Sequence, residues 1–113
     1  MVSYDFPDSQ KISKRADFQK ILREGKKVHT RHFIVVCCKA DHGTVRLGLA
    51  VSRKVGNAVK RNRVKRLIRE FFRRNKSLFA ISSDAVIIAK QGAHELSYQQ
   101  VTAEMEKHAP FEL

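Results

Sequence analysis

Several residue types are scarce or absent in this sequence. Tryptophan is absent, and the 113 residues include only two prolines and two cysteines. The cysteines, Cys37 and Cys38, are adjacent, so they cannot link distant parts of a fold, and a reducing cytoplasm is the expected location. No apolar run reaches the roughly 18 residues of a membrane-spanning helix, and residues 1–10 are polar and acidic. We therefore expect neither a transmembrane helix nor a secretory signal.

Acidic residues are scarce as well. Eleven Asp and Glu oppose 23 Lys and Arg, which gives a net charge of +12. The acids are too few and too scattered to suggest a nuclease site built on metal-binding carboxylates, and no local motif suggests a nucleophile with a histidine base. His29 and His32 lie three positions apart in an extended segment, so they would point to opposite faces and could not share a metal. We expect no catalytic residue and no metal site in the chain, and a polyanionic partner, nucleic acid before membrane.

The length and the apolar fraction of 42% allow one domain over residues 1–113, with residues 1–10 as an irregular extension. Hydrophobic periodicity predicts helices over about 14–24, 57–74 and from 97 onward, and strands over 33–38, 44–52 and 84–90. Ser13 and Gly25 are the expected start and stop signals of the first helix. The strand over 44–52 has one face of small and polar residues, including Gly48, which would let another backbone approach closely.

The densest positive charge lies in residues 53–74, which hold ten basic residues and a single acid, Glu70. Helical spacing gathers the apolar residues of this segment on one face and leaves the basic residues on the other, as a positively charged ridge. The apolar face comprises Val64, Leu67, Ile68, Phe71 and Phe72. A merely solvated helix would balance its cations with acids three or four positions away, and this one does not. The uncompensated repulsion favours a bound nucleic acid, whether RNA or DNA.

Three segments together carry a family signature: RKVGNAVKRNRVKRLIRE at residues 53–70, LGLAVS before it and DAVIIAK after it. They resemble the signature of the bacterial ribonuclease P protein component family, and the similarity extends over roughly residues 11–107, including Asp17, Phe18 and Gly25. The resemblance implies an α+β fold, a small α/β sandwich of order α-β-β-(β)-α-β-α. Its mixed sheet would contain an unusual left-handed βαβ crossover, as in the second domain of ribosomal protein S5. That handedness departs from the usual rule for parallel strands.

The resemblance also implies a division of labour. A catalytic RNA subunit, ribonuclease P RNA, would perform the Mg²⁺-dependent removal of the 5′ leader from precursor tRNA. The protein would bind that RNA and the leader without contributing a catalytic residue. No membrane or DNA partner is implied.

By position, the resemblance assigns two sets of residues to RNA. The ridge set comprises Arg53, Lys54, Asn57, Lys60, Arg61, Asn62, Arg63, Lys65, Arg66, Arg69 and Arg73. The leader set, in a cleft between the first helix and the sheet, comprises Phe18, Leu22, Phe33, Val36 and Lys90. Leu22 and Val36 stand where some members carry aromatics, which weakens base stacking there. Lys90 replaces an arginine and keeps the charge without the planar fork.

Other interpretations remain open. The charge also fits a ribosomal or other structural RNA-binding protein without a role in tRNA processing. A stand-alone nuclease is disfavoured by the missing carboxylate or histidine cluster. A DNA-binding protein that reads the major groove is disfavoured because the basic helix is apolar along one face and so must pack on its own domain. Phe18 itself fits either the cleft or an ordinary core position.

Overall fold

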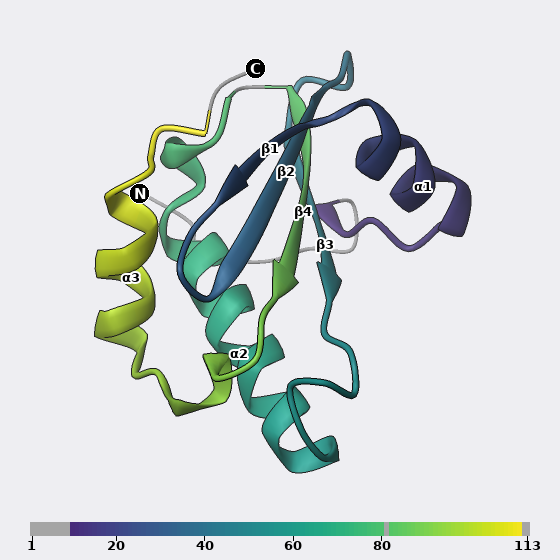
Figure 1. Cartoon of the computed structure of the whole chain (residues 1–113). Helices are drawn as coiled ribbons and strands as arrows, with labels where there is room; N and C mark the ends of the chain where they lie inside the picture. Colours follow the sequence, from purple (N-terminus) through teal and green to yellow (C-terminus); the bar gives the residue numbers. More distant parts are fainter. Residues whose placement is uncertain (1–9, 81, 112–113) are drawn as a thin grey trace.

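The computed structural model describes residues 10–80 and 82–111. The elements in chain order are α1 (Arg15–Glu24), β1 (Lys26–His29), β2 (Phe33–Lys39), β3 (Val45–Ala50), α2 (Ala58–Arg74), η2 (Lys76–Leu78), β4 (Ser83–Ala89), η3 (Ala93–Glu95) and α3 (Tyr98–Glu106) (Figure 1). The expected irregular extension, residues 1–10, lies outside the described residues except for Gln10. Among the described residues, no helix combines the length and apolar character needed to span a bilayer.

The four strands form one mixed sheet in the order β1-β2-β4-β3. Strand β2 pairs antiparallel with β1 and with β4, whereas β3 and β4 are parallel neighbours joined by α2. Helix α1 lies over one face of the sheet, and α2 and α3 lie over the other (Figure 1). The predicted α+β sandwich with a mixed sheet is therefore confirmed. The central place of β2 and β4 explains their nearly continuous apolar sequences, because both of their faces are covered.

The sheet separates two cores of unequal size. The larger core lies under α2 and α3, and it includes the predicted apolar face of α2, all of it buried, together with Val101 and Met105 of α3. Phe79 packs against Phe72 and Phe111 there, with ring centroids 5.4 and 5.1 Å apart. The smaller core lies under α1 and consists of Ile12, Ile21, Val36 and Val86, with Phe18 and Leu22 half-buried at its margin.

Two of the expected helix signals act differently from the prediction. Ser13 is not the cap of α1, because Lys14 occupies the N-cap position and makes no side-chain cap hydrogen bond. Gly25 does end α1, but its φ of −76° is accessible to any residue. What requires glycine is space, since a Cβ at Gly25 would lie 2.6 Å from the carbonyl oxygen of Ile21 and from Cγ1 of Val36. The end of α1 is thereby pressed against β2.

The signals of the other two helices act as predicted. Asn57 is the N-cap of α2, and its side-chain oxygen accepts a hydrogen bond from the backbone N–H of Lys60 at 3.0 Å. Ser97 and Gln100 form the predicted capping box at the start of α3. Strand β1 matches no predicted range, because its sequence, Lys-Lys-Val-His, has a single apolar residue and lies at the edge of the sheet.

Candidate nucleic-acid interface

The solvent side of α2 carries the predicted ridge. Because the apolar face of the helix is buried against the sheet, the remaining positions project outward. The structure leaves exposed Arg53, Lys54, Asn57, Lys60, Asn62, Arg66 and Arg69, and half-buries Arg61, Lys65 and Arg73. The structure therefore brings all of these predicted residues together on one side of one helix and the turn that precedes it.

Arg63 behaves differently from the rest of the ridge. Its Nε donates a hydrogen bond to the carbonyl oxygen of His94 at 2.9 Å, and its Nη2 donates one to the carbonyl oxygen of Leu96 at 3.0 Å. These carbonyls belong to the segment that leads from η3 into α3. Arg63 is exposed like most of the ridge, but its position at the border of the apolar face directs its guanidinium group toward this segment.

The C-terminal end of the ridge is partly neutralised by its single acid. Glu70 accepts hydrogen bonds from Arg73 and Arg74, each at 2.5 Å. The hydrogen bond from Arg73, supported by Arg74, holds the pKa of Glu70 below its usual value. The uncompensated positive charge therefore lies toward the N-terminal part of α2, between Lys60 and Arg69.

The face of the sheet under α1 contains three of the predicted leader residues. Phe18 and Leu22 are half-buried, so part of each side chain remains accessible, whereas Val36 is completely buried beneath α1. The ring of Phe18 lies against Gly48, where a Cβ would come within 2.6 Å of the ring atom Cζ. The small face of β3 was expected to admit another backbone, and it admits this aromatic ring instead.

Two predicted leader residues lie elsewhere. Phe33 is completely buried in the larger core, on the α2 side of the sheet. Its assignment to the cleft is wrong, because side chains alternate along β2 and Phe33 therefore points away from the face that holds Val36. Lys90 follows the end of β4, where its Nζ donates a hydrogen bond to the carbonyl oxygen of Thr30 at 2.6 Å. That bond holds Lys90 at the loop between β1 and β2.

A groove of about 270 Å³ connects the α1 side of the molecule with the ridge. Phe18 and Leu49 line it together with Lys65 and Arg69 of α2. The chain entering α1 borders the same groove, because the backbone N–H of Ile12 donates to the carbonyl oxygen of Leu47 at 2.9 Å. The aromatic side chain of the cleft and two cations of the ridge therefore share one continuous surface.

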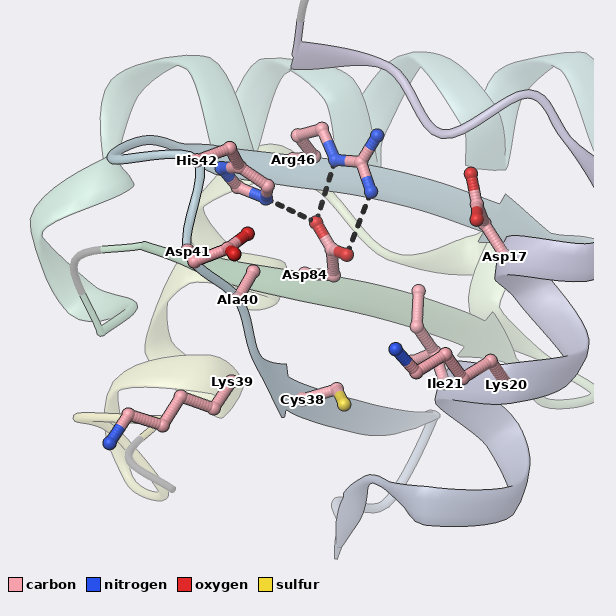
Figure 2. A pocket seen from close by; sticks show the side chains of 10 residues that line it. All are labelled: Asp17, Lys20, Ile21, Cys38, Lys39, Ala40, Asp41, His42, Arg46 and Asp84. Atoms are coloured by element: carbon pink, nitrogen blue, oxygen red, sulfur yellow. Dashed lines mark hydrogen bonds and ion pairs between the residues drawn. The ribbon is translucent and has the colours of Figure 1, made fainter.

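A larger hollow, about 480 Å³, lies between α1 and the strand ends that meet near the turn after β2 (Figure 2). Figure 2 shows His42 and Arg46 turned toward Asp84. Arg46 donates to both carboxylate oxygens, at 2.7 and 2.8 Å, and Nε2 of His42 lies 2.8 Å from one of them. Burial alone would raise the pKa of Asp84, but the hydrogen bonds from Arg46 and His42 outweigh it and lower the pKa. These groups satisfy one another's hydrogen-bonding capacity and tie β3 to β4.

Metal-binding side chains do not gather in the described parts of the chain. Over residues 10–80 and 82–111, no three His, Cys, Asp or Glu lie close enough together to hold a metal ion. The cations on α2 and the partly accessible aromatic ring on α1 suit the binding of a polyanion.

Sequence reasoning missed one exposed apolar residue of α2. Val59 lies among the basic residues at the start of α2, and 77% of its surface is exposed. Its position, five residues before Val64, places it off the apolar face at helical spacing, so the pattern contained the signal. Val59 and the half-buried ring of Tyr98 on α3 line a common hollow between the two helices.

The sequence of the chain matches a known family over nearly its whole length. The profile of the family described as Ribonuclease P matches residues 6–110. The ribonuclease P protein component of Geotalea uraniireducens is 43% identical over 105 residues, which cover 93% of this chain and 92% of that relative. The ribonuclease P protein component of Syntrophus aciditrophicus is 48% identical over 97 residues, which cover 86% of this chain and 82% of the relative.

Solved structures give the same result for the fold. The RNase P protein of Staphylococcus aureus has a TM-score of 0.78 and 40% identity, over 87% of this chain and 90% of that one. The RNase P protein of Thermotoga maritima has a TM-score of 0.79 and 33% identity, over 88% of this chain and 94% of that one. The matched region includes α1, the sheet and the basic helix, so the similarity does not rest on one motif. The chain belongs to the ribonuclease P protein family.

Proposed function

We propose that this chain is the protein subunit of ribonuclease P and acts in 5′ maturation of tRNA by binding two RNAs on two surfaces. The ridge of α2 would bind the RNA subunit, and the cleft beside α1 would hold the 5′ leader of precursor tRNA. The observation that carries the proposal is the excess of positive charge on α2, where eight basic residues between Lys60 and Arg74 are opposed by the single acid Glu70. The chain that carries this helix belongs to the ribonuclease P protein family.

The chemistry of the ridge suits an RNA backbone. An arginine can donate to two phosphate oxygens with a fixed geometry, whereas a lysine supplies a mobile point charge. Asn62, placed between Arg61 and Arg63, both donates and accepts, so it can fix a local geometry that the cations cannot. A leader of variable sequence is best held by backbone charge and by stacking on an aromatic face, which the groove shared by Phe18, Lys65 and Arg69 provides.

The hydrolytic step itself is assigned to the RNA subunit. The described residues offer no group of side chains that fits Mg²⁺, so we propose that the RNA and the substrate phosphates bind the magnesium that hydrolysis requires. This chain would contribute binding and orientation. A cytoplasmic location fits its two free cysteines, and burial raises the pKa of Cys37 to about 12, which keeps its thiol protonated.

The role as a ribonuclease P subunit is tested by processing of precursor tRNA with and without a bacterial ribonuclease P RNA. Cleavage that releases the leader should require that RNA and should be stimulated by the chain. Cleavage by the purified, RNA-free chain would overturn the assignment of catalysis to RNA. Binding of the RNA subunit without any effect on processing would favour the alternative, a structural RNA-binding protein.

The cleft assignment is tested by Phe18→Ala in the assembled enzyme. Affinity for precursor tRNA with a leader should fall by about 1–3 kcal/mol, the free energy of one lost stacking contact. Mature tRNA, which has no leader, should bind the variant and the wild-type enzyme equally. An equal loss for both ligands would contradict the assignment.

A further inference from the structure

A second hollow borders the ridge on the side that faces α3. It has a volume of about 440 Å³ and is lined by Val59, Arg63, Arg66, Leu67, Glu70 and Tyr98. None of these residues belongs to the predicted leader set, and the hollow shares no lining residue with the groove beside Phe18. We call it the α2–α3 groove. The ridge therefore has a groove along each of its two sides.

The lining of the α2–α3 groove contains an accessible apolar surface. Val59 is 77% exposed and is the one large hydrophobic side chain classed as exposed among residues 10–80 and 82–111. Leu67 is almost fully buried beneath the groove, and the ring of Tyr98 is half-buried at its side. A single exposed valine on a surface is ordinary, but here it adjoins an aromatic ring in a concave site. Covering that surface would remove apolar area from water.

The rim of the groove is charged and partly fixed in place. The two hydrogen bonds from Arg63 to backbone carbonyls hold its guanidinium group beside α3. Arg66 is exposed and, within the described part of the chain, makes no hydrogen bond or ion pair. The carboxylate of Glu70 is held by Arg73 and Arg74, and the guanidinium carbon of Arg74 lies 5.8 Å from the centroid of the Tyr98 ring.

This combination selects the chemistry of an occupant. The excess of cations along α2 favours a polyanion and disfavours a basic or neutral apolar peptide. Single-stranded nucleic acid presents phosphates to cations and the flat face of an unstacked base to aromatic and apolar side chains. The ionised Glu70 adds an acceptor for an exocyclic amino group on the base edge. One nucleotide can therefore satisfy the apolar lining and the charged rim together.

We propose that the α2–α3 groove receives an unstacked base of the RNA subunit, with its base against Val59 and Tyr98 and its phosphates near Arg66. This inference rests on the proposed function, because the groove borders the ridge that would bind the RNA subunit. The RNA subunit is preferred over the leader as the source of the base, because α1 lies across the sheet from α3 (Figure 1). Phe18 packs against the smaller core, on the α1 side.

The inference is tested by Val59→Ser, with Ala58→Ser as the matched control. Both positions are exposed on α2, but Ala58 does not line the groove. In titrations with a bacterial ribonuclease P RNA, Val59→Ser should weaken binding about five- to tenfold, the lower part of the range for loss of a base contact. The dependence of log affinity on log salt should keep its slope, because no charge is removed. Ala58→Ser should bind within about twofold of the wild type.

Base-specific modification of the same complexes identifies the nucleotide. With dimethyl sulfate and a carbodiimide, which together report on all four bases, the wild-type protein should protect at least one unpaired base that Val59→Ser leaves reactive at saturating protein. The groove assignment would be overturned if Val59→Ser bound the RNA subunit with wild-type affinity, or if Ala58→Ser lost as much affinity as Val59→Ser. It would also be overturned if Val59→Ser bound the RNA subunit normally but weakened the binding of precursor tRNA. Failure of the wild-type chain to bind the RNA would instead overturn the proposed function.

Discussion

Two arginines three positions apart on α2 have different environments. Both are exposed, but Arg63 donates hydrogen bonds to the carbonyl oxygens of His94 and Leu96, whereas Arg66 makes no such bond within the described residues. A sequence motif treats both as equivalent cations. In the structure, Arg63 also connects α2 to the segment before α3, so its removal should affect the protein before any RNA is present.

Replacing each arginine by alanine separates these roles. Arg63→Ala should lower the free energy of unfolding by about 1–2 kcal/mol, because two hydrogen bonds from a charged group are lost near the surface. Arg66→Ala should change it by less than about 0.5 kcal/mol. Instead, Arg66→Ala should reduce the steepness of the plot of log affinity for the RNA subunit against log salt concentration. Its slope should become shallower by about 0.7–0.9, the effect of one lost phosphate contact. Urea unfolding and salt-dependent titration measure both quantities, and equal stability of the two variants would contradict the assignment.

The contact between Gly48 and Phe18 is a second feature that depends on single residues. Gly48→Ala would place a Cβ about 2.6 Å from the Phe18 ring, and the resulting overpacking should cost about 1–3 kcal/mol of stability. Phe18→Ala should cost a similar amount, because the ring is only half-buried. In the double variant the clash is gone, so the two losses should not add. Urea unfolding of all four proteins tests this, and simple additivity would show that the ring does not limit the size of residue 48.

At the scale of elements, the parallel pair β3 and β4 depends on one ionic cluster. Arg46 and Asp84 are direct register partners, and their bidentate contact is supplemented by His42. Asp84→Asn should lower the free energy of unfolding by about 1–3 kcal/mol, since the half-buried Arg46 loses its charged partner. Asp41→Asn is the control, because Asp41 lines the same hollow but is exposed, and its effect should stay within about 0.5 kcal/mol.

The same cluster predicts the direction of a pH effect. The pKa of Asp84 is below its usual value of 3.8 in the folded state, so its ionised form stabilises the fold at pH values above 3.8. This stabilisation should be lost as the pH falls through the folded-state pKa. Urea unfolding from about pH 6 to about pH 3 should show a smaller loss of stability for Asp84→Asn than for the wild type. Parallel curves for the two proteins would contradict the pKa shift.

The elements that sequence analysis predicted are those whose side chains have one dominant environment. The apolar face of α2 and the two-sided burial of β2 follow from periodicity alone, because each residue there is either in the core or out of it. The order implied by the family resemblance allowed a further strand before the basic helix, but periodicity did not locate β1, because an edge strand with mostly charged side chains lacks that contrast. The error at Phe33 came from carrying a position over by resemblance without applying the alternation along β2, which separates it from Val36.

The specific partners of individual side chains could not be predicted from the sequence. The bonds of Arg63 join residues about 30 positions apart, and the groove beside Phe18 includes Lys65 and Arg69 from the other side of β3. Such neighbours depend on how the helices are set against the sheet, which hydrophobic spacing does not specify. Composition and charge predicted that a nucleic acid binds, whereas the two grooves that flank the ridge required the three-dimensional structure.

At the scale of the whole molecule, the two surfaces proposed to bind RNA belong to different layers. The ridge is part of the layer formed by α2 and α3, which also contains the phenylalanine cluster and most of the buried side chains. The cleft belongs to the layer formed by α1. Hydrogen bonds between the β1–β2 loop and α3 stabilise the larger layer. The carboxylate of Glu104 lies 2.6 Å from Nδ1 of His32 and accepts a hydrogen bond from the hydroxyl of Thr30 at 2.5 Å. The sheet is the element that the layers share.

The small size of the core under α1 has a consequence for local opening. With four buried residues holding it, α1 should detach from the sheet at a lower free energy than global unfolding, whereas α2 should open only when the whole protein unfolds. Amide hydrogen exchange should therefore be faster in α1 than in α2 by an order of magnitude or more. A bound precursor tRNA should slow exchange in α1, and the RNA subunit alone should leave it fast. The surface proposed for the leader would then be the part of the protein that opens locally most often. Leaders of different sequence could therefore be accommodated without local opening of α2.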